Sequence, residues 1–471
     1  DGRERAPLAA HRDLYLDQAG KVIPNLSIDG ALAAGIPGEP AALAHLARYY
    51  GRLPLAESLL PAIKLAREGF NVDSHYRRMA NWRLTVLRSH PASAMQFLQK
   101  GEVPEEGALI KQPELAETLE RIALQGADGF YKGEIAQRLV DGVRAAGGIW
   151  SLQDLTDYRV VERQPVVGHY RGLKITSAAP PSSGGVALIT MLNILRGFDL
   201  QTQEEPFHTH LLVEAMRRAY RDRAEYMGDP DYIDIPVKIL THPHYAAGLA
   251  RDIRLQRASQ SLGGQLQREA GRDTTHFSIL DREGNRVAAT LSINYPFGSG
   301  FVVPGTGVLL NDEMDDFSAS PGVPNVYGLV GGEANAIAGG KRMLSSMTPT
   351  FVEDDRRVAI LGTPGGSRII TMVLLGILEM ANGKGPSRWV ERPRFHHQYL
   401  PDVVQFEPGA FSDSLRQQLT AMGHRLKPLE RRYGNMQAVL WDKQAGKVEA
   451  ASDFRGLGFS QVVKTSSQNS E

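Results

Sequence analysis

Residues 271–294 read GRDTTHFSILDREGNRVAATLSIN. Two alternating stretches, 275–280 and 286–293, flank a polar turn, and this pattern predicts a β-hairpin. The first strand begins with two threonines directly after Asp273. Threonine favours strands, so propensity alone could account for them. The alternative is that the chain is cut before Thr274 and that this threonine becomes a nucleophile.

The length of the turn sets the register of the predicted hairpin. With residues 281–285 as the loop, Thr274 faces Ser292. Opposed residues share one face of a hairpin, with Cβ atoms about 4.5–5.5 Å apart. Asn294 follows on the same face. The register therefore gathers two hydroxyls and an amide at the end of the hairpin, beside the stretch that would be cut.

A threonine hydroxyl needs a base before it can attack. His276 shares the face of Thr274 but lies two residues further along the chain. A chain cut before Thr274 supplies a base directly, because an α-amino group has a pKa of about 7.7–8.0 and can accept the hydroxyl proton near neutrality. This is the N-terminal-threonine form of nucleophilic catalysis.

Composition narrows the class of protein. The chain has 471 residues with 53 basic and 53 acidic side chains, so its net charge is zero. That balance gives no electrostatic attraction for nucleic acid or for an anionic membrane. Cysteine is absent from the sequence, which excludes disulfides, thiol nucleophiles and thiolate metal sites. No apolar run reaches the roughly 18 residues of a membrane span, and the richest run, 369–380, predicts a buried helix.

The character of the sequence changes at Thr274. Residues 38–170 show mostly helical spacing of apolar residues, residues 170–177 predict one short strand, and residues 251–273 are polar and typical of a linker. A later helix is expected at 368–382. The remaining strands are expected at 301–303, 350–353, 358–362, 403–406, 437–441 and 447–450. A layered α/β architecture fits this order.

Seven blocks of the sequence resemble the γ-glutamyltranspeptidase family. They are RERAP, PPSSGG, DTTHFSILDREGN, NDEMDDFSASPGVPNVYGLVGG, KRMLSSMTPT, TPGGSRIIT and RPRFHHQYLPD, in that order over nearly the whole chain. The resemblance implies an α/β (α+β) fold of the N-terminal-nucleophile hydrolase type, a four-layer αββα sandwich. It also implies self-cleavage between Asp273 and Thr274. The larger subunit, 1–273, and the smaller catalytic subunit, 274–471, would form the sandwich together.

The resemblance further implies a γ-glutamyltransferase with glutathione hydrolase activity that needs no cofactor. Its substrates would be glutathione and related γ-glutamyl amides, with water, amino acids or dipeptides as acceptors. The alternatives are a cephalosporin (glutaryl) acylase of the same superfamily and an unprocessed, inactive homologue. A periplasmic or secreted location is implied as well. Family members normally carry several dozen residues before the RERAP block, so we expect part of the sandwich either to precede Asp1 or to be absent.

The resemblance assigns chemical roles to residues that alone would suggest little. Thr274 would be the nucleophile, and Ser292 would replace the family's second hydroxyl, which is often a threonine. The backbone N–H groups of Gly365 and Gly366, between a strand and a helix, would form an oxyanion hole. A glycine pair by itself would indicate only a turn.

The substrate would be held by its two opposite charges. The set expected at its α-carboxylate is Arg3, Ser345 and Ser346, and the set expected at its α-ammonium is Asn294, Glu313 and Asp316. An arginine suits a carboxylate because its planar donors match both oxygens. We therefore expect an arginine on one side of the site and carboxylates on the other. Without the resemblance, Arg3 would indicate a solvated charge, the serine pair a turn cap, and the acidic stretch 312–316 a solvated loop or a cation site.

Two loops and two histidine pairs complete the prediction. Tyr327 lies in the Pro/Gly-rich stretch 320–332, which resembles the lid over the glutamyl site and could otherwise be a mobile surface loop. PPSSGG, 180–185, is expected to shape the pocket wall. The histidine pairs are His208/His210 and His396/His397. Neither pair has a third ligand at a suggestive spacing, so we expect neutral structural histidines and no metal.

Overall fold

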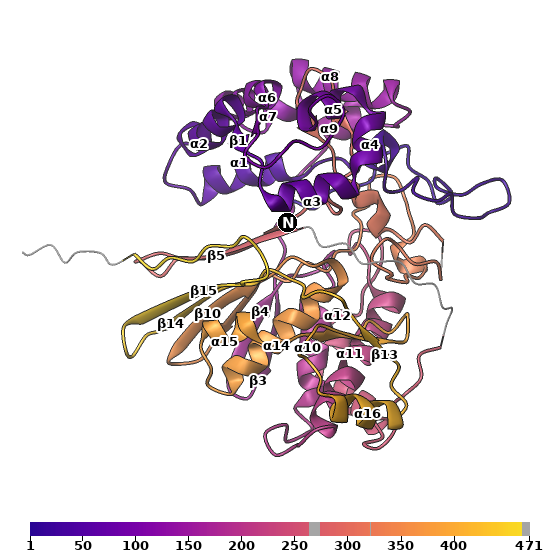
Figure 1. Ribbon diagram of the computed structural model, residues 1–471, viewed down its shortest axis with the longest axis vertical. Coiled ribbons are helices and arrows are strands. Elements are labelled where there is room, and N and C mark those ends of the chain that lie inside the picture. Colours follow the sequence, from indigo (N-terminus) through magenta and orange to yellow (C-terminus); the bar gives the residue numbers. More distant parts are fainter. Residues whose placement is uncertain (263–273, 321, 464–471) are drawn as a thin grey trace, which may run out of the picture.

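The computed structural model describes residues 1–262, 274–320 and 322–463. The first part is rich in helices, as the periodicity predicts: α1 (Glu39–Tyr49), α2 (Leu55–Glu68), α3 (Ser74–Trp82), α4 (Leu84–Ser89), α5 (Pro91–Phe97), α6 (Pro113–Gln125), α7 (Asp128–Tyr131), α8 (Gly133–Ala145) and α9 (Leu152–Thr156). Two short strands, β1 (Phe70–Asn71) and β2 (Leu109–Ile110), pair within this region. Figure 1 shows these helices grouped at one end of the molecule.

A six-stranded antiparallel sheet forms the centre of the fold. Its strand order is β15–β14–β10–β9–β4–β3. The strands are β3 (Val166–Tyr170), β4 (Leu173–Ser177), β9 (Thr350–Glu353), β10 (Arg357–Gly362), β14 (Gln437–Asp442) and β15 (Lys447–Ser452). Because β4 pairs with β9, strands from before and after Thr274 share one sheet. The two parts of the chain therefore fold as one unit.

The short strand expected at 170–177 forms as β4, but the prediction missed the preceding strand, β3, in a region expected to be helical. The structure forms a hairpin there, in which β3 and β4 meet at Tyr170 and Leu173. The connecting residues, Arg171 and Gly172, both have positive φ, at 47° and 78°. Two such residues make the tight turn that matches the twist of a hairpin. The alternating burial of β3 also shows that the helical region ends before Val166.

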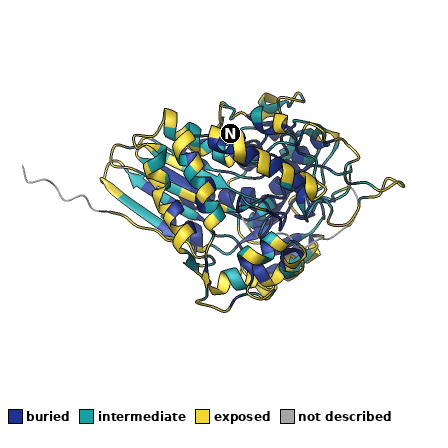
Figure 2. Ribbon diagram, turned by 90° about the horizontal axis from the view of Figure 1, so that it is seen from above, coloured by how far each residue is buried: buried dark blue, intermediate teal, exposed yellow. Residues whose placement is uncertain are grey.

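Two apolar helices cover one face of this sheet. α10 (Gly184–Leu195) and α14 (Ile369–Ala381) are buried on nearly all sides, as expected of helices whose apolar residues are not confined to one stripe. The expected helix at 368–382 is thereby confirmed. The other helices are α11 (Phe207–Tyr226), α12 (Val237–Leu240), α13 (Pro243–Arg251), α15 (Pro386–Glu391) and α16 (Asp413–Ala421). Figure 2 shows the buried residues gathered where these layers meet.

The predicted hairpin forms a second, two-stranded sheet on the opposite face. β5 (Thr275–Leu280) pairs with β6 (Arg286–Leu291) in the expected register, with Thr275 opposite Leu291. β5 packs against β10 and β14. The outward side chains of Phe277, Ile279 and Val287 remain 40%, 49% and 41% exposed. Helix, sheet and sheet layers therefore stack as in an αββα sandwich, with the helix-rich region beyond β5 in Figure 1.

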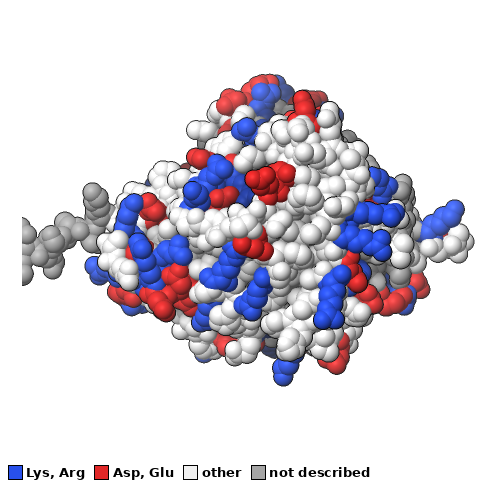
Figure 3. Space-filling model, turned by 90° about the horizontal axis from the view of Figure 1, so that it is seen from below, with Lys and Arg blue, Asp and Glu red and all other residues white. Residues whose placement is uncertain are grey.

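Short strands complete the second half of the chain. They are β7 (Val302–Val303), β8 (Val308–Leu309), β11 (Phe395–His396), β12 (Val404–Phe406) and β13 (Leu426–Pro428). In the described part of the chain, no helix has the length and apolar character to cross a membrane. The face seen in Figure 3 carries interspersed basic and acidic side chains rather than a field of one sign.

Candidate active site

A small cavity of about 20 Å³ gathers most of the residues predicted to act together. Its lining includes Arg3, Thr274, Ser292, Asn294, Glu313, Asp316, Tyr327, Ser345, Ser346 and Gly366. Gly365 precedes Gly366 in the chain but does not itself line the cavity. A wider cavity of about 570 Å³ also opens beside Thr274 and Ser292. Thr274 therefore lies between a small cavity lined by the predicted residues and a wider one.

The hairpin positions the threonine and the serine as predicted. Thr274 Oγ1 donates a hydrogen bond to Ser292 Oγ at 3.2 Å, and the Asn294 backbone N–H donates to the same oxygen at 2.9 Å. Asp273 lies outside the described residues. His276 is buried and bonds Thr290 Oγ1 at 2.8 Å, so its ring faces along the hairpin and away from a role as base. Burial lowers the pKa of His276 to about 3.

Arg3 and the acidic residues lie in direct contact, not on opposite sides of the site as expected. Arg3 donates to Glu313 Oε2 at 2.5 Å and to Asp316 Oδ2 at 2.6 Å, and Glu4 Oε2 lies 3.4 Å from the same guanidinium. Arg3, Glu4 and Glu313 are buried and the Asp316 side chain is 12% exposed, and a buried charge is stable only beside a partner. The residues come together because the acidic stretch forms a 3-10 turn, Glu313–Asp316, beside the N-terminal segment.

The carboxyl groups of this cluster outnumber its guanidinium. Burial raises the pKa of Glu313, although Arg3 opposes the shift, and the neighbouring carboxylates of Glu4 and Asp316 add to it. Among the described residues, no donor reaches the buried Glu313 Oε1. The cluster thus has more carboxyl groups than guanidinium groups and one unsatisfied acceptor, and a bound ammonium group would favour the ionised form of these carboxyls.

The loop that contains Tyr327, described from residue 322 to 332, contributes one wall of the cavity. Tyr327 is 4% exposed, and its hydroxyl donates to the Asn294 carbonyl at 2.6 Å. Asn325 Nδ2 donates to Asp316 Oδ1 at 3.3 Å. The described residues 322–332 are therefore fixed to the acidic cluster and to the hairpin, as a lid would be, and Tyr327 points inward.

The serine pair is supported from behind by PPSSGG. Ser183 donates through both its backbone N–H and its hydroxyl to the Ser345 carbonyl, at 2.8 and 2.7 Å. Arg223 of α11 then joins Ser183 to Ser346, at 2.9 and 3.2 Å. PPSSGG thus braces the wall of the cavity and does not line it. Arg223 was missed from the sequence, where a single arginine on a long helix gives no signal.

Gly365 and Gly366 adopt backbone conformations that favour glycine. Gly365 and Gly366 follow β10 and lead into α14, and both have positive φ, at 140° and 55°. A Cβ atom on Gly366 would lie 2.4 Å from the ring of Tyr327. Gln398, also missed from the sequence, accepts from the Ser367 hydroxyl at 2.7 Å and donates to the Tyr327 carbonyl at 3.2 Å. It ties the glycine loop to the lid.

The pair His396/His397 consists of buried, hydrogen-bonded side chains. His396 bonds Thr371 and Gln398 at 2.9 and 2.8 Å, and His397 bonds Asp402 at 3.0 Å. Burial lowers the pKa of His396 to about 3 and that of His397 to about 4, so both are neutral. They are structural histidines, as expected.

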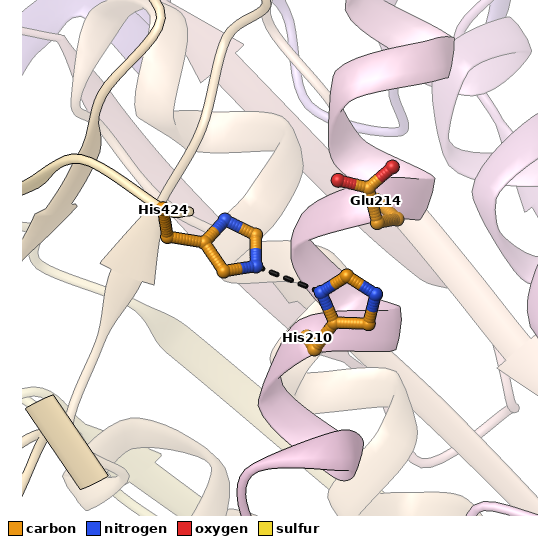
Figure 4. Close-up of side chains that lie close together, drawn as sticks. All are labelled: His210, Glu214 and His424. Atoms are coloured by element: carbon orange, nitrogen blue, oxygen red, sulfur yellow. Dashed lines mark hydrogen bonds between the residues drawn. The ribbon is translucent and has the colours of Figure 1, made fainter. Parts of the chain in front are cut away.

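His210 lies beside two further possible metal ligands that the spacing of His208 and His210 in the sequence did not indicate. It lies with Glu214 of the same helix and with His424, and in the described part of the chain these three could together hold a metal ion (Figure 4). Most of their ligand atoms are engaged, however, although His424 Nδ1 has no hydrogen-bond partner among the described residues. His210 Nδ1 bonds His424 Nε2 at 2.8 Å, and Glu214 accepts from Arg217 and Arg218 at 3.2 and 2.6 Å. Nearby arginines also disfavour a cation.

Comparisons with known proteins agree over both halves of the chain. The family model described as gamma-glutamyltranspeptidase matches residues 1–463. The glutathione hydrolase proenzyme of Escherichia coli (strain K12) is 41% identical, over 97% of this chain and 80% of that protein. The crystal structure of cephalosporin acylase from Bacillus halodurans has a TM-score of 0.83 and 26% identity, over 97% of this chain and 82% of that one. Helicobacter pylori gamma-glutamyltranspeptidase is 39% identical with a TM-score of 0.54, over 55% and 75%.

Proposed function

This chain belongs to the γ-glutamyltranspeptidase family, and on that premise we propose that it is a γ-glutamyltransferase and glutathione hydrolase, activated by self-cleavage between Asp273 and Thr274. The observation that carries the proposal is a single cavity in which a threonine at the start of a hairpin faces an arginine–carboxylate cluster. Such a cluster suits a glutamyl group, which carries an ammonium and a carboxylate on one carbon.

Self-cleavage begins at the threonine hydroxyl. Thr274 Oγ attacks the carbonyl carbon of Asp273, and the bond from that carbon to the Thr274 nitrogen breaks as the hydroxyl proton passes to the nitrogen. Water then hydrolyses the resulting ester. The products are a larger subunit, 1–273, and a smaller subunit, 274–471, whose first residue has a free α-amine. Their shared sheet favours a stable heterodimer, because separation would unpair β4 from β9.

The mature enzyme uses the same oxygen on its donor. The α-amine of Thr274 takes the hydroxyl proton as Oγ attacks the γ-carbonyl carbon. The N–H groups of Gly365 and Gly366 stabilise the oxyanion, and the ammonium returns its proton to the leaving amine. The γ-glutamyl ester then passes to water, an amino acid or a dipeptide. No cofactor takes part in these steps.

Donor recognition rests on the charged cluster. We assign the α-carboxylate to Arg3, Ser345 and Ser346, and the α-ammonium to Asn294, Glu313 and Asp316. The unsatisfied Glu313 Oε1 supports the second assignment, since an ammonium would supply its missing donor. The cavity of about 20 Å³ has room for little more than one water molecule, so donor binding requires the Tyr327 loop or the Arg3 contacts to shift.

Hydrolysis of γ-glutamyl-p-nitroanilide, with and without glycylglycine, tests the activity. Denaturing electrophoresis of the same sample separates an active, split enzyme from an inactive homologue that remains one chain. A cephalosporin (glutaryl) acylase is the second candidate, because a protein of that name is a structural neighbour. Turnover of a glutaryl amide in preference to the γ-glutamyl donor would favour it. The family also suggests a periplasmic or secreted location, which fractionation of the source cells tests.

Replacement of Ser292 by alanine should slow both self-cleavage and donor turnover. The change removes the oxygen that accepts from Thr274 Oγ1 and from the Asn294 N–H. Loss of such a hydrogen bond corresponds to about two- to tenfold in rate. Ser292→Thr keeps the hydroxyl and should preserve both rates. Identical time courses for wild type and Ser292→Ala would contradict a role for this oxygen.

Replacement of Gly366 by alanine should reduce kcat by about 100-fold or more. The added methyl group would lie 2.4 Å from the Tyr327 ring, so the glycine loop must shift. Its backbone N–H groups would then no longer point toward the oxyanion. Gly446→Ala is the matched control, because Gly446 has φ 61° and no atom within 4 Å of an added Cβ. Equal kcat losses in the two variants would attribute the effect to backbone strain and not to the oxyanion hole.

A further inference from the structure

The last described residues before Thr274 are fastened to the fold by a buried polar network, which we call the linker clamp. It consists of residues 254–262 and the side chains of His210, Glu214, Arg217, Asp402 and His424. This stretch belongs to the polar segment 251–273, which was expected to be a linker. None of these side chains lines the cavity that contains Thr274.

Two carboxylates hold the backbone of the segment. Glu214 Oε1 accepts the Ser259 N–H at 3.1 Å, and Asp402 Oδ2 accepts the Ser261 N–H at 3.0 Å. Arg217 joins the two acids, because it donates to Glu214 at 3.2 Å, to the Ser261 hydroxyl at 2.7 Å and also to Asp402. Burial by itself would raise the pKa of Glu214, but Arg217 and the other donors lower it to about 2. The carboxylate is therefore ionised at neutral pH.

The segment bonds the part of the chain that follows Thr274 at several points. The Ala258 N–H donates to the Met422 carbonyl at 2.7 Å, and the Tyr399 hydroxyl donates to the Leu262 carbonyl at 3.0 Å. Asp402 supplies the third contact. Residues 258–262 are thus bound directly to the part of the chain that becomes the smaller subunit.

The histidine pair adds a contact at the beginning of the segment. His210 Nε2 lies 2.9 Å from the Arg254 carbonyl, which can only accept, so Nε2 carries the proton. The Nδ1 atom of this neutral ring then accepts from His424 Nε2 (Figure 4). The pair therefore links Arg254 through α11 to the later half of the chain.

We propose that the linker clamp fastens the carboxy-terminal part of the larger subunit to the smaller subunit and stays closed after self-cleavage. The proposal rests on the proposed cleavage before Thr274. In the precursor, the clamp leaves only residues 263–273 to join Leu262 to Thr274, a reach of at most about 40 Å. In the mature enzyme, it retains the end of the larger subunit that cleavage has just released.

The buried charges give the clamp its stability. Opening it would leave Glu214, Arg217 and Asp402 without part of their bonding in a site where their side chains are 0%, 5% and 13% exposed. Opening would also move the last fixed point back to α13, which ends at Arg251. The chain to Thr274 would then be about twice as long, and loop closure slows by only about threefold for such a change. The main consequence of the clamp is therefore retention of the segment, with a smaller effect on cleavage.

Native-state trypsin digestion tests this assignment in the purified protein. Arg257 precedes the buried Ala258, so cleavage after Arg257 requires the clamp to open. The mass of the larger fragment reports that cut. Asp402→Asn keeps the side-chain shape, but it replaces one carboxylate oxygen by an amide nitrogen. That nitrogen donates and cannot accept, so at least one hydrogen bond from Arg217, His397 or the Ser261 N–H is lost. We expect cleavage after Arg257 to accelerate at least about tenfold, because the variant breaks a buried charge pair. Self-cleavage should slow by no more than about threefold, and donor turnover by the split enzyme should be unchanged.

Two further variants make the result decisive. Ser261→Pro removes the same hydrogen bond from the other side, and it replaces Asp402→Asn if that variant does not fold. Asp413→Asn is the control, because Asp413 lies on α16 with an 81% exposed side chain and should leave the tryptic rate unchanged. Equal rates after Arg257 in wild type and in both clamp variants would overturn the clamp. A wild-type chain that never splits would overturn the proposed function instead, and the tryptic comparison on the single chain would still decide the clamp.

Discussion

Replacement of Thr274 by alanine should leave one chain of 51.6 kDa where the wild type gives two fragments. The reason is that Thr274 Oγ must attack the Asp273 carbonyl before the chain can split. The same change should lower turnover of γ-glutamyl-p-nitroanilide by about 10,000-fold or more, since both the nucleophile and the free α-amine are lost. Denaturing electrophoresis measures the first result and steady-state kinetics the second.

The adjacent threonine supplies the matched control. Thr275 differs from Thr274 by one position, but it pairs with Leu291 and its exposed side chain lies on the opposite face of the hairpin. Thr275→Ala should therefore split and turn over donor as the wild type does. Thr274→Ser, which keeps the hydroxyl, should restore cleavage. A Thr274→Ala chain that still splits between residues 273 and 274 would refute the assignment of the nucleophile.

The hairpin shows what local sequence can predict. Loop length and alternation determine the register of β5 and β6. This register places Thr274 opposite Ser292, where Thr274 Oγ1 lies 3.2 Å from Ser292 Oγ. These are short-range rules, so a single sequence is enough to apply them. The same holds for α14, whose apolar length indicates a buried helix. The family resemblance was needed for Arg3, because no local pattern connects it to Glu313 across the chain.

Long-range contacts account for what the sequence did not reveal. Gln398 acts by joining the Ser367 hydroxyl to the Tyr327 carbonyl, two loops that only the folded chain brings together. Arg223 likewise reaches Ser346 from another element. The expected separation of Arg3 from the carboxylates failed for a physical reason. Desolvated charges pair with each other, whereas the prediction considered only how each would meet a substrate.

That pairing changes how the acidic residues should be tested. Asp316 Oδ2 accepts from Arg3 at 2.6 Å, and Oδ1 accepts from Asn325 at 3.3 Å. Alanine at this position would release Arg3 and the lid loop together with the charge. Asparagine keeps an oxygen for Arg3 and removes the charge, and it loses only the weaker contact with Asn325, because an amide nitrogen cannot accept from Asn325 Nδ2. Asp316→Asn is therefore the informative variant for recognition of the α-ammonium.

Asp316→Asn should lose about 30- to 4,000-fold in kcat/KM toward γ-glutamyl donors, because loss of one member of a buried, hydrogen-bonded charge pair costs about 2–5 kcal/mol. Its kcat/KM toward a glutaryl amide should fall far less, since that donor has no ammonium to bind. Self-cleavage should continue, as the change leaves Thr274 and Ser292 in place. The measurement is kcat/KM for both donors on wild type and variant.

Glu4→Gln distinguishes recognition of the ammonium from support of Arg3. Glu4 lies 3.4 Å from the same guanidinium but does not line the cavity, so its loss should affect both donors alike and only slightly. If Asp316→Asn also lowers the two kcat/KM values in equal proportion, Asp316 serves to orient Arg3 or the lid. A wild type that prefers the glutaryl donor would favour the acylase. That preference would show that the carboxylates do not serve to bind an ammonium group.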